Sequence, residues 1–74
     1  MEENLEKWCE DIRSTIRDTG NYVRALMDHN YFQDKEQFKG QYGEMKANIM
    51  LSYRHLEDAR MRLGKVMQQI RSRV

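Results

Sequence analysis

The stretch 54-RHLEDARMRLGKVM-67 decides the fold. Its leucines, alanine and valine recur every three or four residues, which is the spacing of one apolar face of a helix. The same alternation begins after Phe38 and continues to Ile70 with an average step of about 3.5 residues, typical of helices packed side by side. The sequence therefore predicts one long helix from about residue 34 to about residue 71.

A second apolar stripe lies nearer the N-terminus. From Leu5 and Trp8 to Leu26 it also steps by three or four residues, which predicts a helix over about residues 4–28. Asp34 stands three residues before Gln37, the spacing of a capping box, and so marks the start of the second helix after a short loop at about 29–33. The expected fold is all-α: a single domain, residues 1–74, forming an antiparallel two-helix hairpin with a longer C-terminal helix.

This short loop fixes the expected register of the hairpin. Residues whose numbers sum to about 63 would lie level, so that Gly20 faces Gly43 and Trp8 lies near His55. The first helix would then end opposite about residue 60, and the seam beyond it would project by about 22 Å without a partner. A homo-oligomeric helical bundle built on the C-terminal helix is the expected assembly.

Size and composition favour the same reading. A chain of 74 residues buries little apolar surface by itself, and one cysteine allows no internal disulfide. Cys9, His29 and His55 lack the spacing of metal ligands, so neither a metal nor another cofactor is expected. No apolar run is long enough for a membrane span, which predicts a cytoplasmic protein without membrane partners.

Charge is unevenly distributed along the chain. The net charge is +1, but no acid follows Asp58, so the tail carries five bases, whereas the first 58 residues hold 8 bases against 12 acids. Such a tail suits an anionic ligand or an acidic partner surface, and it also complements a helix macrodipole. Arg60 and Arg62 either hold phosphate or pair with Glu57 and Asp58. Because those acids interrupt the basic face, duplex nucleic acid is not an expected partner.

Candidate ligand-binding residues combine cations with aromatic rings. Arginine grips phosphate through paired hydrogen bonds, and aromatic rings stack on bases. Packing in a helical core remains the alternative role of the two aromatic residues in this set. The candidates, which would converge only between packed protomers, are Trp8, Arg13, Arg17, Tyr53, Arg54, Arg60 and Lys65.

Catalysis is not expected. Cys9 and His55 form the only pair of nucleophile and base that the sequence suggests, and neither a third orienting group nor a Gly-rich oxyanion loop accompanies them. Cys9 is better explained as a buried helix thiol. His55, next to Leu56 on the border of the seam, is better explained as an interface residue.

Two runs carry a resemblance to a known family. The runs 16-IRDTGNYVRAL-26 and 51-LSYRHLEDARMRLGKVMQ-68 resemble the two helices of the phage anti-CBASS cyclic-nucleotide sponges, whose helical hairpin is shared with sponges that act against Thoeris defence. The resemblance implies a non-catalytic homohexamer in the host cytoplasm. It would sequester cyclic di- or trinucleotides, or cyclic ADP-ribose isomers, in inter-subunit pockets and so keep host immune effectors inactive.

The resemblance also implies roles for individual residues. Arg17 occupies the place of a phosphate-holding basic residue, and Thr19 and Lys65 fall where a trinucleotide-sized pocket would be lined. The family carries a base-stacking aromatic ahead of its first helix; here Trp8 is the substitute candidate. The alternative function is an oligomeric coiled-coil module that binds a protein or nucleic acid through its basic C-terminal helix.

Overall fold

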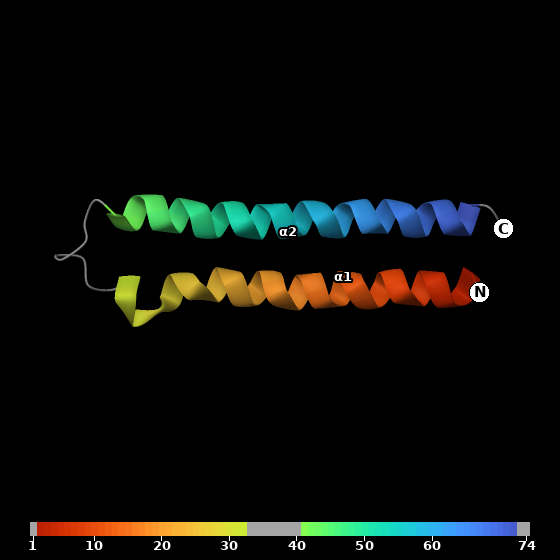
Figure 1. The fold of residues 1–74 in the computed structure, drawn as a ribbon, viewed down its shortest axis with the longest axis horizontal. Helices are drawn as coiled ribbons and strands as arrows, with labels where there is room; N and C mark the ends of the chain where they lie inside the picture. The colour runs from red at the N-terminus through yellow and green to blue at the C-terminus, as the bar shows by residue number, and fades with distance from the viewer. Residues whose placement is uncertain (1, 33–40, 73–74) are drawn as a thin grey trace.

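Two long helices lie antiparallel and side by side in the computed structural model, which describes residues 2–32 and 41–72 (Figure 1). Helix α1 spans Glu2–Ala25 and helix α2 spans Gln41–Ser72. Two short 3-10 turns, η1 at Leu26–Asp28 and η2 at Asn30–Phe32, follow α1. The prediction of an all-α hairpin with a longer second helix is confirmed for the described residues, which contain no strand.

The end of α1 is built around one histidine. His29 has φ −64° and ψ 145°, an extended conformation that stops the helix, and its N–H donates to the Leu26 carbonyl at 3.0 Å. The His29 Nδ1 accepts from the Tyr31 N–H, and the His29 carbonyl accepts from the Phe32 N–H, both at 3.0 Å. The expected helix to residue 28 therefore tightens into a 3-10 turn after Ala25, and the expected loop contains a second turn. The predicted capping box at Asp34 lies outside the described residues.

The register of the hairpin differs from the predicted one. Gly20 lies against the Tyr53 ring, where a Cβ atom would be 3.6 Å from two ring carbons, and Glu6 pairs with Arg71. Level positions thus have numbers that sum to about 73 to 77 rather than 63, and Gly20 does not face Gly43. The chain continues through η2, and α2 is described from Gln41 onward. Relative to the predicted register, α2 is thus displaced along α1.

This register removes the predicted overhang. The ion pair between Glu6 and Arg71 joins the first turns of α1 to the last turn of α2, and Figure 1 shows the two chain ends at the same end of the hairpin. The helix α2 therefore has no free projection that a second copy must cover. Self-association would therefore have to involve a face of the hairpin instead of its end.

The hairpin has almost no interior. Among the described residues only Cys9, Phe32 and Met67 are buried apolar side chains. The accessible surface is 6340 Å², whereas a compact monomer of 9.0 kDa would expose about 4,900 Å². The extents of 58 × 16 × 10 Å and the radius of gyration of 17.2 Å agree with this, since a compact chain of this length would have about 11 Å.

The two broad faces of the hairpin differ in character. Each residue advances by about 100° around a helix axis, so Trp8 and Glu10 lie on opposite sides of the buried Cys9. Because the helices are antiparallel, the residue directly before Cys9 and the residue directly before Met67 lie on one face of the hairpin. The residues directly after Cys9 and Met67 lie on the other face. The first, the apolar face, exposes at least 37% of each of Leu5, Trp8, Ile12, Leu26, Met45 and Val66. We call the second the polar face; it carries Glu10, Arg17 and Gln68.

The observed register places two glycines in different surroundings, and this difference can be tested. Gly20 faces the Tyr53 ring, whereas a Cβ at Gly43 would meet nothing within 4 Å. We expect Gly20→Leu to lower the free energy of unfolding by about 1 to 3 kcal/mol through overpacking. The matched Gly43→Leu should be neutral or should stabilise by up to about 1 kcal/mol, since glycine is a poor helix former. Urea unfolding followed by circular dichroism measures both; equal effects would contradict this register.

Candidate functional site

The arginine site is a shallow depression on the polar face. It has a volume of about 200 Å³ and is lined by Glu10, Arg13, Ser14, Arg17 and Arg60. Glu10 and Ser14 are four residues apart on α1, as are Arg13 and Arg17, so the helix period alone brings these pairs to one side. Antiparallel packing adds Arg60 from α2. Three of the predicted ligand-binding residues, Arg13, Arg17 and Arg60, are thereby brought together.

Arg17 is the most accessible cation of this site. Its Nη2 donates to the Ser14 hydroxyl at 3.3 Å, and its Nε lies 3.5 Å from a carboxylate oxygen of Asp18. The Arg17 side chain is 53% exposed. An ion pair this exposed contributes little energy and is readily exchanged for another anion. Arg17 and the Ser14 hydroxyl can therefore both donate hydrogen bonds to a bound phosphate oxygen.

Arg13 has a structural role at the same place. Its Nε donates to the backbone carbonyl of Arg60 at 3.1 Å, and its Nη1 lies 3.9 Å from the Met67 sulfur. The guanidinium covers Gly64, where a Cβ atom would lie 3.5 Å away. Arg13 thus joins α1 to α2 and forms a wall of the site. Only some of its guanidinium N–H groups are available to a ligand.

Two of the basic residues that follow Asp58 form ion pairs within α2. Arg60 Nη1 lies 3.3 Å from the Glu57 carboxylate, and Arg62 Nε lies 3.0 Å from the Asp58 carboxylate. Both arginines therefore form local ion pairs in the protein without ligand. Arg60 nevertheless lines the arginine site, whereas Arg62, which is 76% exposed, belongs to none of the described depressions.

A neighbouring depression on the polar face adds Lys65. Its volume is about 390 Å³, and it shares Arg13 with the arginine site. Because Arg13 is common to both, the two depressions adjoin near the terminal end of the hairpin. The residues that line it are Arg13, Met61, Gly64, Lys65, Met67, Gln68 and Arg71.

The other candidates lie elsewhere. Trp8 and Thr19 fall on the side of α1 that carries the apolar face, turned away from the arginine site. Tyr53 packs in the helix seam against Gly20, with the Arg24 guanidinium 5.5 Å from its ring centre. Arg54 is exposed and lines none of the described depressions. In a single hairpin the predicted set therefore splits between two faces and the seam.

Sequence reasoning missed several residues of the polar face. Ser14 and Glu10 line the arginine site, and Arg71 lines the neighbouring depression. A signal for the α1 residues was present in the sequence: Glu10, Ser14 and Arg17 are four and three residues apart and so share one side of a helix. The contribution of α2 was not accessible in this way, because it depends on the register.

Cys9 and His55 are far apart. Cys9 is buried near the open end of the hairpin, whereas the observed register places His55 level with about residues 18 to 22. The separation along the axis is about 14 to 20 Å. These two residues cannot form a nucleophile and base pair in this hairpin.

The described residues show neither a metal-binding cluster nor a helix that could span a membrane. No group of three or more His, Cys, Asp or Glu side chains there is arranged to hold a metal ion. None of the helices in this part of the chain combines the length and apolar character that crossing a membrane requires.

Comparison of the chain with protein-family models, with curated proteins and with solved structures finds no match. The similarity of two runs to the cyclic-nucleotide sponges therefore stays a prediction.

Arg13 and Arg17 should differ in their effect on stability. We expect Arg13→Ala to lower the free energy of unfolding by about 1 to 2 kcal/mol, because the hydrogen bond to Arg60 and the packing on Gly64 are lost. The control Arg17→Ala, whose contacts are exposed, should change it by less than about 0.5 kcal/mol. Thermal and urea unfolding measure both. If Arg13→Ala were as mild as Arg17→Ala, Arg13 would not join the helices.

Proposed function

We propose that this protein is a non-catalytic, self-associating binding protein that sequesters cyclic nucleotides in the cytoplasm of a phage-infected bacterium. The observation that carries the proposal is the exposed Arg17 beside the Ser14 hydroxyl in the arginine site. Arg17 is also the position at which the resemblance to the anti-CBASS sponges implies a phosphate-holding residue.

The chemistry of the polar face suits a phosphodiester. A planar guanidinium can form paired hydrogen bonds with two phosphate oxygens, and these charge-assisted bonds are among the stronger ones in proteins. Arg60 faces the same depression and can exchange its Glu57 partner for a ligand. Lys65, in the adjoining depression, supplies a second cation for a ligand that carries more than one phosphate.

The size of the arginine site supports a shared pocket. At about 200 Å³ it is smaller than the roughly 300 to 1,000 Å³ typical of sites for small molecules. It holds a phosphate group and its neighbourhood, but not a whole cyclic dinucleotide. The remainder of the ligand would extend into the adjoining Lys65 depression.

The apolar face supports self-association. The hairpin exposes about 1,500 Å² more than a compact monomer of its mass. A standard protein interface buries about 800 Å² on each partner, so one or two contacts of this size would remove the excess. Trp8, exposed by 66%, lies within this face and is the type of residue that dominates interface energies.

Ligand capture should depend on the two cations. We expect Arg17→Ala and Lys65→Ala each to weaken the binding of a cyclic di- or trinucleotide roughly tenfold to a hundredfold, the effect of losing a charged hydrogen bond. Arg62→Ala, which removes a cation outside the depressions, is the control and should change little. Isothermal titration with a panel of cyclic nucleotides and cyclic ADP-ribose isomers measures this.

Release of the bound ligand tests the absence of catalysis. The nucleotide recovered from heat-denatured protein should be chemically unchanged. Degraded ligand, or equal affinity of Arg17→Ala and the wild-type protein for every compound of the panel, would refute the proposal.

Self-association should depend on one face. We expect Trp8→Asp to shift the protein towards monomer in sedimentation velocity, because a charge then interrupts the apolar face. Met61→Asp is the matched control: Met61 is 62% exposed, almost as much as Trp8, but lies on the polar face. A wild-type protein that stays monomeric at micromolar concentration would exclude self-association.

The exposed apolar face also supports a second candidate function, that of a module which binds another protein. A helix of another protein could cover Trp8, Ile12 and Val66 as well as a second copy does. In that case the purified protein alone would be monomeric and would capture no cyclic nucleotide. Nucleic-acid binding through the basic end of α2 would instead weaken steeply with salt.

A further inference from the structure

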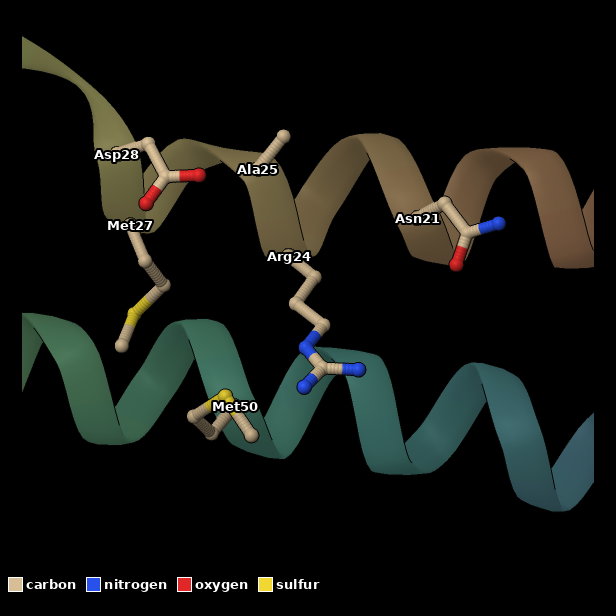
Figure 2. Close-up of a pocket in the computed structure, with 6 residues that line it drawn as sticks. All are labelled: Asn21, Arg24, Ala25, Met27, Asp28 and Met50. Carbon is tan, nitrogen blue, oxygen red and sulfur yellow. The ribbon is translucent and has the colours of Figure 1, made fainter.

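A third depression on the polar face lies at the opposite end of the hairpin from Lys65. It has a volume of about 490 Å³ and is open to solvent between the end of α1 and the first half of α2 (Figure 2). We propose that it binds a purine nucleoside monophosphate, with the base on a methionine floor and the phosphate on Arg24. The residues that line it are Asn21, Arg24, Ala25, Met27, Asp28 and Met50.

The floor of this depression is made of two thioethers. Met27 projects from η1 towards α2, where Met50 lies close to it, as Figure 2 shows, and both side chains are half-buried. Methionine is flexible and polarisable, and its sulfur makes favourable contacts with aromatic rings. Two such side chains from facing helices give a flat ring an apolar surface that adapts to its shape.

Arg24 supplies the cation. Its side chain points towards α2 in Figure 2, and its guanidinium lies 5.5 Å from the centre of the Tyr53 ring. A cation–π contact of this kind orients the guanidinium without occupying the N–H groups at its edge. Among the described residues Arg24 forms no ion pair within 4 Å, so those N–H groups remain available to an anion.

Asp28 and Asn21 supply hydrogen-bonding groups at the rim. Asp28 is in η1, whose tighter turn departs from the α-helical spacing, and it forms no ion pair with Arg24 in the described structure although the two are four residues apart. A carboxylate accepts hydrogen bonds from an exocyclic amino group or from ribose hydroxyls, and the Asn21 amide both donates and accepts. The rim therefore offers a cation for phosphate and acceptors for the N–H edge of adenine.

This pocket is separate from the arginine site. The two share no residue, and α1 rises by about 10.5 Å between Arg17 and Arg24. Its volume falls within the range typical of small-molecule sites. The inference does not rest on the proposed function, because neither the arginine site nor self-association enters it.

The two methionines provide the readout. The full-length protein, labelled with ¹³C at its methionine methyl groups, is titrated with AMP, adenosine, ribose 5-phosphate and tryptophan. We expect AMP to shift the Met27 and Met50 signals with a dissociation constant below about 1 mM. Adenosine should bind at least about tenfold more weakly because it lacks the phosphate. Ribose 5-phosphate should leave both signals unchanged because it lacks the ring.

Variants assign the contacts. Arg24→Gln should weaken AMP binding about tenfold or more, whereas Arg62→Gln, a cation outside this depression, should not. Asp28→Asn should reduce the preference for AMP over inosine monophosphate, which has no exocyclic amino group. Arg17→Ala should leave AMP binding here unchanged, so this inference and the proposed function fail separately.

Three results would overturn the assignment. The first is that AMP shifts neither methionine signal, or shifts all methionine signals equally. The second is that Arg24→Gln binds AMP as tightly as the wild-type protein does. The third is that tryptophan binds as tightly as AMP, which would indicate a site for zwitterionic aromatic amino acids. Circular dichroism of Arg24→Gln and Asp28→Asn establishes that each variant is folded.

Discussion

The structure depends on a single seam between α1 and α2. Cys9 and Met67 are buried along it, Gly20 admits the Tyr53 ring, and Arg13 joins the helices by donating to the Arg60 carbonyl. A two-helix hairpin has no third layer to cover its faces, so these contacts along the seam determine both the register and the surface left exposed. Every candidate binding feature of this protein is a consequence of which side chains the seam leaves outside.

The packing of α1 against α2 leaves two faces of the hairpin exposed, and each face is suited to a different kind of binding. One broad face exposes Trp8, Ile12 and Val66 and is suited to association with another helical surface. The other carries the described depressions, which have arginines at their edges, among them Arg17 and Arg24. A small protein can in this way use one side to gain the stability that a hairpin lacks and the other side to bind anions. The cations of the polar face are only partly neutralised, since Arg17 pairs with Asp18 at an exposed position and Arg60 pairs with Glu57 at a half-buried one.

The candidate site was partly predictable. Arg13 and Arg17 could be placed on one side of α1 from their spacing alone, because the helix period is fixed by the backbone. Their meeting with Arg60 and the neighbouring Lys65 could not be placed, since a change of one residue in the connection slides α2 along α1. Trp8 and Thr19 were grouped with the cations from the sequence, yet each lies on the other face. Hydrophobic periodicity placed the apolar residues of each helix on one continuous side. In the structure, some of these residues are buried between the two helices and the others are exposed on the apolar face.

The sequence by itself determined the two helices, their order and the greater length of the second, because apolar spacing and helix propensity are local properties of the chain. It also determined that the basic residues crowd the end of α2. Only the tertiary structure decided the register, which removed the expected overhang by pairing Glu6 with Arg71, and the division between the apolar and polar faces. The physical reason is that register depends on the path of the chain between the helices, and no helical period records it.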